Sequence, residues 1–178
     1  TPRLTMSLQA GDGKGARDSK TWWPTPTLRV WKKAVDLGKT DWREAFKILN
    51  PVFADNVCFH PPTYWKPKRG KKIALFLLKN VSEIFEDFQY TRCFCDSLGR
   101  NAVLEFKCRI PPVPGQEESR TNRSMVVEGV DIIEMDNHGK IIDFKVMVRP
   151  PNGALLLKNH MEIRVQKFFA KLAPRATL

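Results

Sequence analysis

The fold is decided by the stretch from Ala102 to Ile110, which reads AVLEFKCRI. Apolar and charged side chains alternate along it, as expected for a strand with one face on a core and the other in water. The apolar face contains Leu104, Phe106, Cys108 and Ile110. The alternation therefore predicts a strand from a sheet that is covered on one side only.

The period of two continues on both sides of this stretch. It predicts further strands at 88–95, 124–135 and 140–148, separated by turn residues at 96–99 and 136–139. Apolar residues at helical spacing predict helices at 30–37, 42–49, 73–85 and 157–172, and a short strand lies at 57–60. We predict an α+β fold: a cone-shaped, curved antiparallel sheet packed on about three helices, plus a C-terminal helix.

Several short phrases carry a resemblance to a known family. They are FADNVCF at 53–59, RGKKI at 69–73, FEDF at 85–88, VEGVD at 127–131 and GKI at 139–141. In their order and spacing they resemble the nuclear transport factor 2-like superfamily, in its polyketide cyclase-like (SnoaL-like) branch. The resemblance implies a cone-shaped pocket between sheet and helices, but not one activity, because this fold carries isomerases, cyclases, hydrolases and binding modules.

The parity of the strands selects the side chains that face this pocket. It directs Asp131 inward on 124–135, Phe106 inward on 102–110, and Tyr90 and Arg92 inward on 88–95. His60 and Tyr64, near the end of the short strand, are expected at the pocket mouth. Asp131 and Arg92 stand out because both are chargeable groups on faces predicted to be buried.

Two interpretations of this pocket stay open. In the cyclases and steroid isomerases that the resemblance brings in, a pocket carboxylate moves a proton next to a carbonyl. Asp131 would be that base, Arg92 or Tyr90 would steady the enolate, and His60 would be a second proton carrier. Alternatively, Arg92 and Asp131 neutralise each other as a buried ion pair. The family's steroid isomerases use a tyrosine with two acids, whereas only one pocket acid is found here.

The composition favours acidic partners. The 178 residues carry a net charge of +11 and the pI is about 9.7. The basic residues cluster in one predicted loop, at Lys66, Lys68, Arg69, Lys71 and Lys72. No motif for reading nucleic-acid sequence and no apolar run long enough to span a bilayer is found. We expect partners among other protein subunits, acidic surfaces or anionic lipid.

The four cysteines, Cys58, Cys93, Cys95 and Cys108, lack the spacing of a zinc site. We expect reduced thiols, no metal and no cofactor.

The chain divides into a basic irregular arm at 1–27, one α+β domain at 28–172 and a basic tail at 173–178. The arm resembles a segment near an organelle-targeting region in composition, so we expect a mitochondrial or plastid protein, soluble or peripherally attached to a membrane. Trp22 and Trp23 are predicted to anchor the arm, either on a partner or on the domain itself. We favour a non-catalytic accessory subunit of a larger organellar assembly. A small cofactor-free cyclase or isomerase, or a binder of a small hydrophobic ligand, is the alternative.

Overall fold

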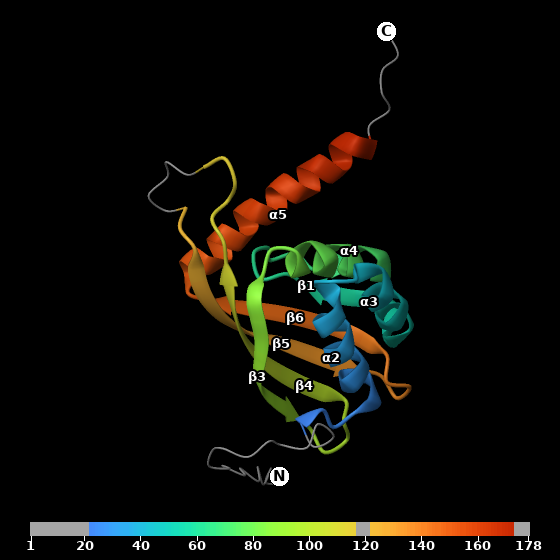
Figure 1. Ribbon diagram of the computed structural model, residues 1–178. Coiled ribbons are helices and arrows are strands. Elements are labelled where there is room, and N and C mark those ends of the chain that lie inside the picture. The colour runs from blue at the N-terminus through green and yellow to red at the C-terminus, as the bar shows by residue number, and fades with distance from the viewer. Residues whose placement is uncertain (1–21, 117–121, 173–178) are drawn as a thin grey trace.

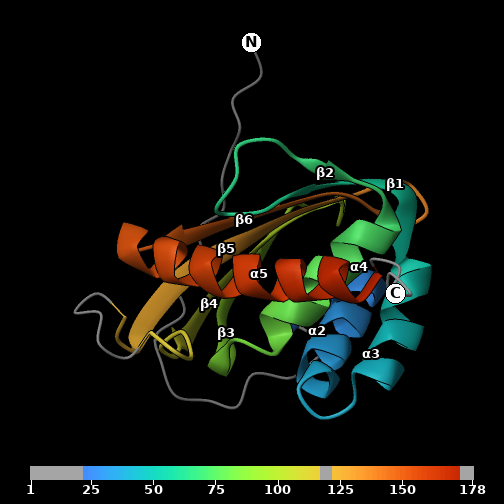
Figure 2. The same cartoon turned by 90° about the horizontal axis from the view of Figure 1, so that it is seen from above.

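The sheet has six strands, and helices cover its concave face. The computed structural model describes residues 22–116 and 122–172. Residues 1–21 of the predicted arm (1–27) and the predicted tail at 173–178 therefore lie outside the described residues. The elements in chain order are α2 (Pro26–Gly38), α3 (Trp42–Leu49), η1 (Asn50–Val52), β1 (Phe53–His60), β2 (Lys68–Arg69), α4 (Lys71–Ser82), β3 (Glu86–Cys95), β4 (Asn101–Ile110), β5 (Met125–Met135), β6 (Ile141–Arg149) and α5 (Pro151–Leu172). Figure 1 shows α2, α3 and α4 on one side of the curved sheet, and Figure 2 shows α5 lying across its end near α4.

The first two helices begin at residues that cap them. The hydroxyl of Thr25 accepts a hydrogen bond of 3.1 Å from the backbone N–H of Leu28, and Pro26 follows at the first helical position. The carboxylate of Asp41 accepts a bond of 3.0 Å from the N–H of Glu44 at the start of α3. These local caps fix where the helices start, and hence which of their residues face the sheet.

The strand order is β2-β1-β6-β5-β4-β3. The four long strands β3 to β6 form an antiparallel meander, as predicted. The sheet as a whole is mixed, because β1 pairs parallel with β6. The strand β2 adds to the edge of β1, within the stretch that the sequence indicated as a basic loop. The α+β class and the packing of helices on a curved sheet are confirmed.

The prediction for Arg92 is wrong, and the reason is a β-bulge. In the pairing of β3 with β4, Tyr90 lies opposite Phe106 and Arg92 lies opposite Glu105, so Thr91 is an extra residue. An extra residue reverses which side chains face inward beyond it. Cys93 and Cys95 therefore pack against the core. Arg92 points outward, with 63% of its side chain exposed, and pairs with Glu105.

The described part of the predicted arm, which begins at Trp22, packs on the domain. Trp23 is 5% exposed within the main core cluster, and its ring meets that of Tyr90 edge-on with centroids 5.4 Å apart. Trp22 packs against the same cluster. Of the two anchoring modes, the structure has docking on the domain itself, because these rings complete the core beside α2. The packed part of the chain thus begins before residue 28.

Candidate functional site

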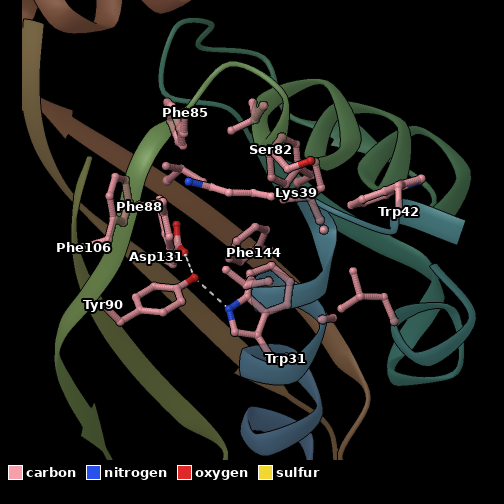
Figure 3. Close-up of a pocket in the computed structure, with 18 of the residues that line it drawn as sticks. Trp31, Lys39, Trp42, Ser82, Phe85, Phe88, Tyr90, Phe106, Asp131 and Phe144 are labelled. Atoms are coloured by element: carbon pink, nitrogen blue, oxygen red, sulfur yellow. Dashed lines mark hydrogen bonds between the residues drawn. The ribbon is translucent and has the colours of Figure 1, made fainter. Parts of the chain in front are cut away.

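An apolar pocket lies between the helices and the concave face of the sheet (Figure 3). Its volume is about 100 Å³, and its wall is almost entirely carbon. Aromatic rings from six elements and the α4–β3 connection supply most of this wall: Trp31, Trp42, Phe59, Phe85, Phe88, Tyr90, Phe106 and Phe144. An apolar cavity of this kind favours an apolar ligand over water.

Asp131 is the one acid in the wall of this pocket among the described residues. It lies in the middle of β5, opposite Leu104 on one neighbouring strand and Val146 on the other. The residue is 5% exposed. Apolar neighbours on both strands leave its charge without compensation from the sheet itself.

A chain of two hydrogen bonds holds the carboxylate. The hydroxyl of Tyr90 donates a bond of 2.6 Å to Oδ2 of Asp131, and the indole N–H of Trp31 donates a bond of 2.8 Å to the same hydroxyl. Figure 3 draws both bonds. Because the Tyr90 oxygen accepts from Trp31, its own proton is directed to Asp131. The geometry orients the carboxylate in the pocket.

Burial controls the protonation of both groups. It raises the pKa of Asp131 from 3.8 to about 7, and the hydrogen bond from Tyr90 opposes this rise only in part. Burial also raises the pKa of Tyr90 well above 10, and the nearby Asp131 charge adds to the effect. At neutral pH the site therefore combines a carboxyl group that can take up or release a proton with a phenol that keeps its own.

Lys39 supplies the positive charge at the mouth of the pocket. It follows α2 directly, and its side chain reaches across the opening above Asp131 (Figure 3). Lys39 is the one cation in the described part of the pocket wall. Sequence reasoning missed it because it reads as an ordinary surface lysine after a helix. It also missed the polar role of Trp31, which appeared only as an apolar helix position.

Three of the predicted site residues lie elsewhere. Arg92 is on the outer face of the sheet, so it neither neutralises Asp131 nor faces the pocket. His60 also points to the outer face, where Nε2 is 2.8 Å from Oδ2 of Asp143. Tyr64 is 44% exposed and donates a hydrogen bond of 3.1 Å to Glu162. The pocket thus contains Tyr90, Phe106 and Asp131 from the predicted set, and lacks Arg92, His60 and Tyr64.

The predicted basic surface borders a different groove, between α4 and α5. Tyr64, Lys68 and Lys72 line this groove with apolar residues of both helices. Lys71 is 2.5 Å from Asp55 and is thus engaged within the domain, whereas Lys66 and Arg69 are exposed. Trp65 is 97% exposed beside the basic residues.

In the described part of the chain, no helix combines the length and the apolar content needed to cross a bilayer.

Solved structures of other proteins share this architecture. A steroid delta-isomerase from Pseudomonas aeruginosa is 30% identical over 81% of this chain and 92% of its own, with a TM-score of 0.67. An uncharacterised protein with a cystatin-like fold from Silicibacter pomeroyi is 29% identical over 84% of this chain and 92% of its own, with a TM-score of 0.66. A protein classed as a SnoaL-like polyketide cyclase from Jannaschia is 14% identical over 78% of this chain and 91% of its own, with a TM-score of 0.52. No family model and no curated protein sequence matches the chain.

Proposed function

The chain belongs to the nuclear transport factor 2-like superfamily, and we propose that it is a cofactor-free acid–base enzyme of the isomerase or cyclase type. Its substrate would be a small, mainly apolar carbonyl compound. The sequence analysis gave this function as the alternative to an accessory role. Similarity to proteins named as a steroid delta-isomerase and a SnoaL-like polyketide cyclase supports the alternative over the accessory role.

The observation that carries the proposal is the state of Asp131. Its carboxylate is buried in an apolar pocket, oriented by Tyr90, and has a pKa of about 7. A general base works best when its pKa is close to the working pH. A purely structural aspartate in such a position would be expected to have a cation beside it, and Arg92 is not there.

The proposed step is a proton transfer next to a carbonyl. The carboxylate of Asp131 takes the proton from the carbon beside the carbonyl, and the C–H electron pair moves into an enolate. Asp131 then returns the proton to another carbon of the conjugated system, which completes an isomerisation. Tyr90 and Trp31 are positioning residues in this scheme, because the Tyr90 proton is already given to Asp131.

Lys39 fits the charge that develops during this step. Removing the proton moves negative charge from Asp131 to the carbonyl oxygen of the substrate. An ammonium group at the pocket mouth attracts that oxygen. The proposed orientation therefore places the carbonyl oxygen toward Lys39 and the apolar end among the aromatic rings.

The size of the pocket limits the substrate. A cavity of about 150 Å³ holds a benzene molecule, and this pocket has about 100 Å³. The reactive end of a molecule whose remainder projects from the mouth matches this space, and a one-ring substrate would fill the pocket and extend into its mouth. A whole steroid would require several aromatic side chains of the wall to move.

The test uses two β,γ-unsaturated ketones of different size, cyclohex-3-enone and a steroid ketone. Isomerisation produces a conjugated enone, which absorbs in the ultraviolet. We expect turnover of the small ketone by the full chain, and a loss of about 10²- to 10⁴-fold in Asp131→Asn. Glu105→Gln, on the outer face, is the matched control and keeps full activity.

Two results would count against the enzyme. Equal turnover by the wild type and Asp131→Asn would show that Asp131 is not the general base. Quenching of tryptophan fluorescence by bound 2-naphthol, together with no turnover of either ketone between pH 5 and 9, would instead indicate a binder of small hydrophobic ligands.

An accessory role in an assembly is a second candidate, because one observation favours it. Trp65 is 97% exposed, and tryptophan is enriched at protein interfaces. The partner, a protein subunit or an acidic surface, and the organellar location stay predictions. Elution of the native protein near 20.5 kDa in gentle extracts would contradict this role.

A further inference from the structure

A second cluster of reactive side chains lies on the outer face of the sheet, away from the pocket. The thiol of Cys58, the imidazole of His60 and the carboxylate of Asp143 each offer one ligand atom, and these atoms all lie within 4.8 Å of one another. All three residues are half-buried. The cluster is therefore partly shielded from solvent but still accessible to an ion from solution.

The parallel pairing of β1 with β6 creates this cluster. Cys58 and His60 are two residues apart on β1, so they share a face. Cys58 lies directly opposite Asp143 on β6, and His60 lies opposite Lys145. Val57 and Phe59, the neighbours of Cys58, are buried on the inner face. The three ligand atoms thus come from two rigid strands rather than from loops.

We propose that Cys58, His60 and Asp143 form a binding site for a divalent transition-metal ion of the Zn²⁺ type. A thiolate sulfur, an imidazole nitrogen and a carboxylate oxygen are all preferred ligands of Zn²⁺. Bond lengths of about 2.0 to 2.3 Å place tetrahedral ligand atoms roughly 3.3 to 3.8 Å apart. The cluster reaches this spacing with side-chain shifts of about 1 Å.

The charges of the cluster agree with a divalent ion. A thiolate and a carboxylate together cancel two positive charges, and the neutral imidazole adds none. The strand register places Arg69 beside Cys58, Lys145 beside His60 and Glu134 beside Asp143. These neighbours add two positive charges and one negative charge, which disfavours an ion of higher charge and favours an anion or hydroxide as the fourth ligand. The present contact between His60 and Asp143, 2.8 Å long, would open to admit the ion.

The sequence did not indicate this site. The spacing of the four cysteines argued against any metal, and His60 was assigned to the pocket. The ligands become neighbours only because His60 and Asp143, 83 residues apart, meet across paired strands. The site is on the opposite face from Asp131, so it does not depend on the proposed function.

The test is a titration of the full chain with Co²⁺, a spectroscopic substitute for Zn²⁺, in the presence of a thiol-free reductant. We expect one ion per chain, an ultraviolet band from thiolate-to-cobalt charge transfer, and visible bands of a four-coordinate ion. Added Zn²⁺ should remove these bands. Cys58→Ser should abolish the charge-transfer band, and Asp143→Asn, which keeps the thiol, should weaken binding at least tenfold.

Cys95→Ser and His138→Gln are the matched controls, because each removes the same type of side chain outside the cluster. Both should bind Co²⁺ as the wild type does. Absence of the bands in a folded wild type would overturn the proposal. So would bands that persist in Cys58→Ser, or bands that disappear in Cys95→Ser. If Cys58→Ser fails to fold, the tenfold loss in Asp143→Asn decides the matter alone.

Discussion

The two faces of the sheet treat carboxylates in opposite ways. On the outer face two acids of the central strands each pair with an arginine: Glu105 pairs with Arg92, and Glu128 is 2.5 Å from Arg149. The hydrogen bond from Arg92 holds the pKa of Glu105 below its usual value. On the inner face, Asp131 has no salt bridge to any described cation, and burial raises its pKa to about 7.

This difference shows where the fold accepts a cost in stability. An ion pair at the surface contributes little but does little harm. A buried carboxyl group without a cation destabilises its ionised form, and strongly shifted pKa values of this kind gather at functional sites. The comparison therefore separates a face that tolerates exchange of its charged residues from one where each polar atom has a defined role.

The largest difference between the faces should appear on removing an aromatic ring. Phe106 is 1% exposed and its ring lies 5.1 Å from that of Phe88. Phe106→Ala should lower the free energy of unfolding by about 3 to 5 kcal/mol, because it leaves a cavity. Phe94→Ala, at a site 51% exposed on the same sheet, should cost less than about 1 kcal/mol. Urea unfolding of both variants checks this, and similar losses would contradict the assignment of the faces.

The pH dependence of stability should be nearly as large. The pKa of Asp131 is about 7 in the folded state, against an ordinary value of 3.8 for an exposed aspartate, so the folded state binds this proton more tightly. The contribution of Asp131 to the free energy of unfolding is therefore greatest below about pH 4. It falls as the pH rises to about 7, by something on the order of 4 kcal/mol.

Outer-face acids such as Glu105, whose pKa is lowered, act in the opposite direction, so the wild type alone does not isolate the effect. The measurement is the difference in unfolding free energy between Asp131→Asn and the wild type from pH 4 to pH 8. The free energy of unfolding of Asp131→Asn should increase relative to that of the wild type as the pH rises. A constant difference would mean that Asp131 titrates as an exposed acid.

Removing the hydroxyl of Tyr90 should have a moderate effect. Tyr90→Phe deletes the hydrogen bond to Asp131 and leaves the indole N–H of Trp31 without its acceptor. We expect a loss of about 1.5 to 3 kcal/mol and a further rise in the pKa of Asp131, visible in carbon-13 NMR of its carboxyl group. Tyr64→Phe, at an exposed tyrosine, is the control and should change stability by less than about 0.5 kcal/mol. An unchanged carboxyl titration in Tyr90→Phe would exclude the orienting role.

The smallest effect is expected at Arg92. Arg92→Met breaks the ion pair with Glu105 at a position that is 63% exposed, and exposed pairs contribute about 0.2 to 1 kcal/mol. Urea unfolding at low and high salt checks it. A loss of several kcal/mol would support the buried ion pair between Arg92 and Asp131 and would contradict the assignment of Arg92 to the outer face.

Much of the sheet could be predicted because its inward residues follow local alternation. Phe106, Cys108 and Ile110 on β4 and Val127 and Ile133 on β5 are all buried as expected. Asp131 follows the same parity. Periodicity of two is a local property, so it is visible in the sequence wherever a strand pairs without interruption.

The errors have two physical causes. Phe88, Tyr90 and Phe94 continue an apparently perfect alternation, so nothing in the sequence marks Thr91 as the extra residue of a bulge. His60 was predicted at the pocket mouth, but it lies on the outer face, where it meets Asp143 across the pairing of β1 with β6. Lys39 and the cluster of Cys58, His60 and Asp143 likewise arise from contacts between distant segments, which no local pattern encodes.

The parallel pairing of β1 also affects how the protein is made. Apart from the two-residue strand β2, β1 has only β6 as its partner, and His60 precedes its neighbour Asp143 by 83 residues. A ribosome that adds about 5 to 20 residues per second takes roughly 4 to 17 s to synthesise that interval. During this time the nascent β1 has an unpaired edge and an uncovered apolar face, which are the conditions under which chaperones bind. The sheet is completed at β1 only after nearly the whole domain has left the ribosome.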